Sequence, residues 1–227
     1  MFTSFKFSTQ LSLPRGKVLP ASKRVHQKHI IDISGPLKLL TAQLAVNIDC
    51  MSNEVIDMHL LHLPSWAERE LGTFMREKAE EKDLGGACWA IDSFWDITTK
   101  RAVYWHRCEK AFAHLLPGRT ATDMETASAT GTKSFTLSRK DLSRHLGRDV
   151  LVLQDKHVLL KINWCIMFDW TGEAESNVSV ECAVPVVWKE ADESDTFRKI
   201  PETFDSLLRT KGAFEATRIM VALLFAD

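Results

Sequence analysis

Long apolar runs are missing from this sequence, and no uninterrupted hydrophobic stretch approaches the roughly 20 residues that a bilayer-spanning helix needs. No secretory signal is recognisable, and the five cysteines are odd in number and widely spaced. These features argue against a membrane span and against a disulfide framework. We therefore expect an intracellular protein, cytoplasmic or nuclear, whose cysteines are reduced and mostly buried.

The motifs that mark common catalytic and cofactor sites are also absent. Neither GxGxxG nor GxxxxGK[ST] occurs, and there is no GxSxG nucleophile motif. His59 and His62 are three residues apart, but their apolar flanks favour a strand, on which they would face opposite sides. His106 and Cys108 are two apart on a predicted helix and do not face each other. The sequence thus predicts no catalytic residue, no metal site and no cofactor.

Acidic residues are missing from the first 30 positions, although the whole chain holds 29 basic and 30 acidic residues. The basic residues of this segment are Lys6, Arg15, Lys17, Lys23, Arg24 and Lys28. They predict a flexible basic arm over residues 1–33. A mitochondrial transit peptide, which would place the protein in mitochondria, and an ordered edge strand are the alternatives. The rest of the chain is acidic, so nucleic-acid binding would be limited to the arm.

A hydrophobic fraction of 45% and a charged fraction of 26% are typical of a globular protein, and 227 residues suffice for a sizeable core. We expect one α+β domain over residues 34–227. Residues 118–134 are rich in Thr, Ala, Ser and Gly without periodicity, which predicts a flexible loop within it.

A long central helix is predicted at about 87–116, because apolar residues recur there at three- and four-residue steps. The helix before it is expected to start with Ser65 as N-cap and Glu68 completing a capping box, and to stop at Gly85–Gly86. Residues 138–147 form a short capped helix in the same way. Two C-terminal helices follow, at 201–209 and 213–225, and the second is apolar on most sides.

Strict alternation of apolar and polar residues predicts an antiparallel hairpin at 157–188, with Pro185 at an edge or bulge. Residues 150–153 add a third strand. The apolar stretches at 37–49 and 55–63 read as a strand pair, with a short helix as the alternative for the first. The predicted architecture is α+β, with an antiparallel sheet led by this hairpin, packed on the long helix and the two C-terminal helices.

The sequence contains seven tryptophans and only one tyrosine. Four of them occupy apolar positions and are predicted to be core residues: Trp66, Trp95, Trp105 and Trp164. The others do not, and Trp89 shares a helix face with two carboxylates. The candidate partner-binding residues are therefore Trp89, Asp92, Asp96, Trp170 and Trp188. The alternatives are partial packing under neighbouring loops and an ordinary solvated helix face.

These features favour a non-catalytic protein–protein interaction module, which could serve as a subunit of a larger intracellular assembly. A protein partner is expected. The alternative is a small-molecule-binding domain or enzyme with an apolar pocket between the sheet and the long helix. Such a pocket is built from residues distant in the sequence and leaves no linear motif.

Overall fold

The computed structural model describes residues 4–12, 26–118, 137–190, 192 and 195–225. They form two compact units. Unit 1 comprises Met1–Thr98 together with Ile166–Glu175, and unit 2 comprises Thr99–Cys165 together with Ser176–Asp227. The sequence predicted one domain after residue 33, whereas the described residues of that range are shared between two units. The predicted loop at 118–134 lies outside the described residues, apart from Gly118.

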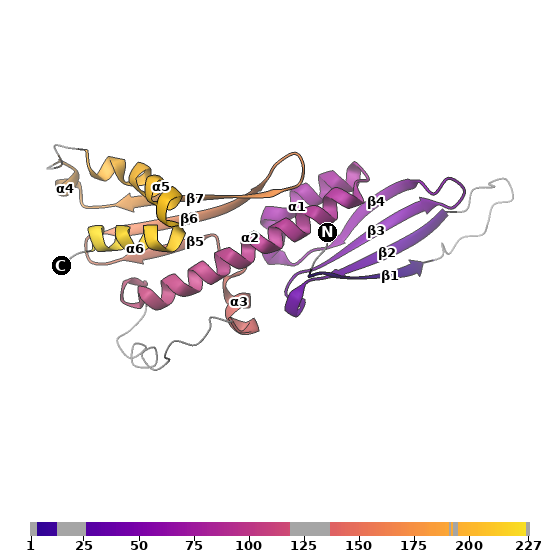
Figure 1. The fold of residues 1–227 in the computed structure, drawn as a ribbon, viewed down its shortest axis with the longest axis horizontal. Coiled ribbons are helices and arrows are strands. Elements are labelled where there is room, and N and C mark those ends of the chain that lie inside the picture. Colours follow the sequence, from indigo (N-terminus) through magenta and orange to yellow (C-terminus); the bar gives the residue numbers. More distant parts are fainter. Residues whose placement is uncertain (1–3, 13–25, 119–136, 191, 193–194, 226–227) are drawn as a thin grey trace. The chain divides into compact units, whose positions relative to one another are not determined.

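Unit 1 contains a four-stranded antiparallel sheet in the order β1-β2-β3-β4, drawn in Figure 1 as neighbouring arrows. Its strands are β1 (Lys6–Ser12), β2 (His26–Ser34), β3 (Thr41–Asp49) and β4 (Val55–His62), with a short 3-10 helix, η1 (Pro36–Lys38), before β3. The predicted strand pair is confirmed as β3 and β4. The described residues of the predicted flexible arm include β1 and most of β2, so the structure differs from that prediction. For β1 it agrees with the alternative expectation, an ordered edge strand.

Alternation explains how a basic segment becomes part of this sheet. Phe7 of β1 lies opposite Ile33 of β2, on the face that carries the apolar residues. Lys6 and Lys28 lie on the other face, in register with Ser34 and Asn47. Charge therefore marks the polar face of the sheet.

The apolar face of the sheet packs against two helices, α1 (Ser65–Glu80) and the first half of α2 (Leu84–Ala111). Val46 and Met58 are buried against Ala79. The predicted cap of α1 is wrong: Pro64 is the N-cap, Ser65 is already helical, and Glu68 pairs with Arg76 instead.

The predicted stop at Gly85–Gly86 is also wrong, because both glycines lie in the first turn of α2. Asp83 caps that turn, and its Oδ1 accepts a hydrogen bond from the Gly86 N–H at 2.8 Å. A Cβ on Gly86 would meet the Asp83 carboxylate at 2.3 Å. Helix α2 therefore begins at Leu84 and ends at Ala111, a few residues earlier at each end than predicted.

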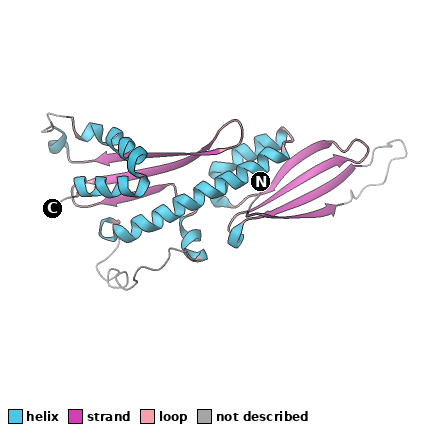
Figure 2. Ribbon diagram, in the orientation of Figure 1, coloured by secondary structure: helices cyan, strands magenta, loops and turns pink. Residues whose placement is uncertain are grey.

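Unit 2 combines the second half of α2 with a three-stranded sheet in the order β5-β6-β7 (Figure 2). Its elements are η2 (Ala113–Leu115), α3 (Arg139–His145), β5 (Val150–Gln154), β6 (Leu159–Phe168), β7 (Ala174–Ala183), α4 (Val186–Glu190), η4 (Phe197–Lys199), α5 (Ile200–Lys211) and α6 (Ala213–Leu224). The last residues of β6 and the first of β7 belong to unit 1.

One face of this sheet and three helices enclose the core of unit 2. Its buried members come from β5, β6, β7, α2, α5 and α6, and include Leu151, Ile162, Trp164, Val180, Trp105, Cys108, Phe204 and Met220. The third strand, the capped helix at Ser138 and the two C-terminal helices are confirmed. The predicted fold class, α+β with a long helix and antiparallel strands, is confirmed as well.

The second strand of the hairpin is shorter than predicted. It ends at Ala183, and the carbonyl of Pro185 accepts a hydrogen bond from the Trp188 N–H at 3.0 Å, in the short helix α4. Pro185 has no N–H to continue the ladder, which explains why the strand stops before it.

All five cysteines are free, as expected, but only Cys108 is fully buried. Burial raises the pKa of its thiol to about 12, so it stays protonated and unreactive.

Candidate functional site

The side chain of Trp170 is 88% exposed, at the turn between β6 and β7. This turn, residues 169–173, is held by hydrogen bonds rather than left loose. Asp169 Oδ1 accepts from the backbone N–H of Thr171 and of Glu173, both at 2.9 Å, and from the Thr171 hydroxyl at 2.6 Å. The hydroxyl of Thr171 also lowers the pKa of the Asp169 carboxyl. A large apolar side chain is thus displayed to solvent on an ordered turn.

Helix α2 fixes the position of this turn within unit 1. Ser93 Oγ donates to the Gly172 carbonyl at 3.2 Å and accepts from the Ala174 N–H at 3.1 Å. Gly172 adopts a φ of +88°, and a Cβ there would lie 3.4 Å from both the Gly86 carbonyl oxygen and the Phe74 ring. A side chain at position 172 would therefore be strained and crowded.

Phe168 anchors the end of β6 in unit 1. Its ring stacks on Phe74 of α1, with centroids 4.8 Å apart, and lies 6.1 Å from Phe94 of α2. Glu70 Oε1 accepts a hydrogen bond from the Ile166 N–H at 3.1 Å. Aromatic stacking and this hydrogen bond hold the segment against both helices.

Four of the five predicted partner-binding residues lie in unit 1. Trp89, Asp92 and Asp96 follow one another along a single face of α2, and Ser93 on that face bonds to the turn that carries Trp170. Trp89 is 43% exposed and Asp96 is exposed, whereas Asp92 is half-buried. We call the exposed part of residues 84–98 and 166–175 the indole surface. The fifth residue, Trp188, belongs to unit 2. Trp170 is distant from α2 in the sequence, and only the fold brings its turn to this face of the helix.

Trp188 occupies a different setting, on helix α4. It is 41% exposed, and its ring centroid lies 5.7 Å from that of His157. Val186 and Val187 on the same short helix are 68% and 70% exposed. The core prediction holds for three of the other tryptophans, Trp95, Trp105 and Trp164, while Trp66 is half-buried against Phe94.

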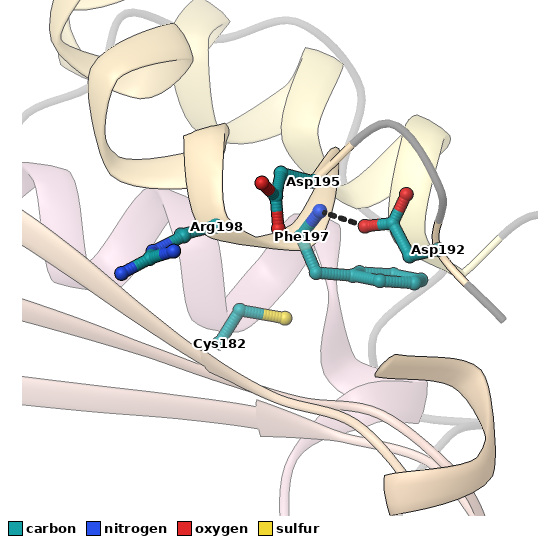
Figure 3. A pocket seen from close by; sticks show the side chains of 5 residues that line it. All are labelled: Cys182, Asp192, Asp195, Phe197 and Arg198. Atoms are coloured by element: carbon teal, nitrogen blue, oxygen red, sulfur yellow. Dashed lines mark hydrogen bonds between the residues drawn. The ribbon is translucent and has the colours of Figure 1, made fainter. Parts of the chain in front are cut away.

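A pocket of about 360 Å³ opens in unit 2 beside β7 (Figure 3). Among the described residues, five line it: Cys182, Asp192, Asp195, Phe197 and Arg198. Asp192 Oδ2 accepts a hydrogen bond from the Phe197 N–H at 2.8 Å, which fixes one wall. The pocket combines two carboxylates and one guanidinium with the Phe197 ring and the Cys182 thiol, so its lining is mixed, unlike the apolar pocket that the sequence suggested as an alternative.

The region between the sheet of unit 2 and α2 is occupied by aromatic side chains. Tyr104, Trp105 and Trp164 are all buried, with ring centroids 4.8–6.2 Å apart. The Tyr104 hydroxyl lies 2.6 Å from the Thr217 hydroxyl of α6. This packing fills the place where the apolar pocket was expected.

A charged cluster around the buried Glu109 and His145 lies beside α3 in unit 2. The carboxylate of Glu109 pairs with Arg148, lies 3.6 Å from Arg144 and is 3.9 Å from His145 Nε2. His145 is 1% exposed, and the ring of His106 lies 5.7 Å from its ring. Burial lowers the pKa of His145 from its ordinary 6.5, against the opposing pull of Glu109. The cluster therefore links α2 to α3 with a neutral histidine inside it.

Lowering the pH from about 7.5 to about 5.5 is expected to destabilise the protein. Because burial lowers its pKa, His145 takes up a proton more readily in the unfolded chain than in the folded one as the pH falls through about 6.5. The unfolded state then binds more protons than the folded state, so the free energy of unfolding decreases as the pH is lowered. Urea unfolding at both pH values measures the loss, which should be smaller in His145→Gln and unchanged in the matched control His114→Gln. An equal loss in His145→Gln would contradict this assignment.

Sequence reasoning missed the groups that hold these sites. Two buried charged residues, Arg101 and Glu109, interrupt the apolar face of α2. A charged residue within an apolar helix face was the sequence signal that could have identified them. The turn that carries Trp170 also had a signal, because an Asp three residues before a Gly is typical of a side-chain-capped turn.

Comparison with protein-family models finds no match for this chain, and no curated protein matches it either. In the parts of the chain that the structure describes, no group of three or more His, Cys, Asp or Glu side chains could hold a metal ion. None of the described helices has both the length and the apolarity needed to cross a membrane.

Proposed function

We propose that this protein is a non-catalytic protein–protein interaction module, acting as a subunit of a larger assembly, and that a partner binds the indole surface of unit 1. The observation that carries the proposal is the 88% exposure of Trp170 on a turn held by Asp169 and Ser93. Trp89, 43% exposed, supplies a second indole on the helix to which that turn is bonded.

Tryptophan is among the residues most enriched at the energetic centres of protein interfaces, because one side chain buries a large area with few rotatable bonds. Leaving that area in water gives up the hydrophobic stabilisation that burial would provide. Preorganisation lowers the entropy lost on binding, and the hydrogen bonds of the turn preorganise Trp170 in this way. An ordered and exposed indole is thus well suited to be an interface anchor.

Replacing Trp170 with alanine is expected to weaken partner binding by about 2 kcal/mol or more, roughly 30-fold in Kd. Stability should change by less than about 0.5 kcal/mol, because the side chain is exposed. Quantitative affinity purification of the tagged chain identifies candidate partners, and titration of each purified partner against both proteins gives the ratio of Kd values.

Met51→Ala is the matched control, since Met51 is an apolar residue of unit 1 that is 77% exposed and lies between β3 and β4. It should leave partner binding unchanged. If Trp170→Ala bound every purified partner as tightly as the wild type, the indole surface would not be the binding site.

The pocket beside β7 supports a second candidate function, the binding of a small molecule. Its volume of about 360 Å³ is within the range of ligand sites, and Arg198 with Asp195 would orient a polar ligand. Screening polar metabolites by thermal shift, with Arg198→Ala for comparison, tests it. A ligand whose stabilisation disappears in Arg198→Ala would favour this function, and the absence of any such ligand would remove it.

The five free cysteines support a reducing, intracellular location, cytoplasmic or nuclear, with the mitochondrion as the alternative. Nucleic-acid binding by the basic segment remains a prediction. Only Lys6 and Lys28 of its six basic residues lie in described strands, both on the polar face of the unit 1 sheet.

A further inference from the structure

We propose that the indole surface recognises a cationic segment, one that presents arginine or lysine side chains to Trp170 and Trp89. This inference rests on the proposed function and specifies the chemistry of the partner. It is carried by the charge of the two stretches of chain that build the surface, and by the exposure of the two indoles among those charges.

The indole surface is acidic throughout. Residues 84–98 and 166–175 contain no lysine, arginine or histidine, and their five acidic residues are Asp92, Asp96, Asp169, Glu173 and Glu175. Asp96, Glu173 and Glu175 are exposed. The pKa of Asp169 is lowered by its hydrogen bond with Thr171, so this carboxylate stays charged well into the acidic range. The surface therefore offers two apolar rings within a field of negative charge.

One basic residue, Lys78, lies beside this surface, and its Cδ would be 3.2 Å from a Cβ on Gly86. The Lys78 ammonium lies 5.3 Å from the centroid of the Phe74 ring. This is the ring that a Cβ on Gly172 of the turn would contact. Lys78 is already paired, with Glu81 at 2.7 Å and Asp83 at 4.0 Å. It therefore does not offset the negative charge of the indole surface.

Arginine and lysine are the side chains that match both features of such a surface. A cation is attracted to the face of an indole, and the neighbouring carboxylates accept its N–H donors. A cation–ring contact also occurs within unit 2, where the Arg107 guanidinium lies 4.0 Å from the centroid of the Phe214 ring. Phosphate backbones are repelled by this charge, which argues against nucleic acid as the occupant.

The experiment uses the full chain and, as probe, a displayed library of random peptides of about twelve residues. Peptides are selected on the wild type and then counter-selected on Trp170→Ala. Peptides that depend on Trp170 are expected to be enriched in arginine and lysine. Their affinity should fall about tenfold or more when salt rises from about 50 mM to about 500 mM.

A rim-neutralised variant isolates the carboxylates. Asp96→Asn, Glu173→Gln and Glu175→Gln are combined, and none of these side chains forms a hydrogen bond or ion pair within the described residues. The control neutralises three exposed carboxylates on other elements, as Glu54→Gln, Glu190→Gln and Glu202→Gln. The rim variant should bind the selected peptides about tenfold more weakly, and the control as tightly as the wild type.

The outcomes separate the two proposals. Trp170-dependent peptides that show no basic enrichment, or that bind the rim variant as tightly as the wild type, would overturn the cationic partner and leave the interaction surface standing. If no peptide and no purified partner depends on Trp170, the proposed function itself fails. Basic peptides that bind Trp170→Ala as well as the wild type would also count against the inference, since nonspecific charge attraction explains them.

Discussion

Replacing Arg101 with alanine is expected to lower the free energy of unfolding by about 3–5 kcal/mol, the largest effect among the substitutions considered. Arg101 is fully buried in unit 2. Its guanidinium donates to the Trp164 carbonyl oxygen of β6 at 2.8 Å and to the Leu146 carbonyl oxygen after α3 at 3.2 Å. Alanine would leave both carbonyls unpaired in the core and open a cavity along α2.

Equilibrium urea unfolding of the wild type, Arg101→Ala and Arg101→Met measures this loss. Methionine keeps most of the side-chain volume but removes the donors, so it should recover only the part of the loss that comes from the cavity. Lys100→Ala, at the exposed neighbouring position of α2, is the control and should stay within about 0.5 kcal/mol of the wild type. A stable Arg101→Met would mean that the two hydrogen bonds contribute little.

Replacing Phe168 with alanine is the second large effect, about 3 kcal/mol, because the ring packs on both Phe74 and Phe94. This substitution should also weaken Trp170-dependent binding, since Phe168 anchors the strand end from which the turn at 169–173 projects. Stability is measured by urea unfolding, and binding by titration with the partner or peptide identified through Trp170.

Met167→Ala is the matched control for Phe168→Ala, since Met167 is the preceding residue of β6 and is 53% exposed. It should cost less than about 0.5 kcal/mol. A double-mutant cycle with Phe74→Ala should give a coupling of about 1 kcal/mol for the stacked pair. Loss of stability with unchanged binding in Phe168→Ala would show that the turn holds its shape without this anchor.

Part of the candidate site could be predicted from local pattern. Trp89, Asp92 and Asp96 share a face because they are spaced three and four apart on a helix, and the long periodic stretch at 87–116 made that helix plain. Trp170 was a candidate because it lies at the predicted hairpin turn, although it continues the alternation of apolar residues along the strand. Its place beside α2 could not be predicted, since the bonds from Ser93 to Gly172 and Ala174 join residues 79 and 81 positions apart.

Local pattern was enough to predict the elements whose apolar and polar residues mark their buried and exposed sides: the alternating strands β5, β6 and β7, the long helix, the capped helix at Ser138 and the α+β class. Tertiary structure decided the assignment of residues 166–175 to unit 1, the pairing of basic β1 and β2 into a sheet, and the burial of Arg101. The reason is physical. Periodicity records which side of an element is apolar, whereas sheet pairing, buried charge and an anchored turn depend on groups that only the folded chain brings together.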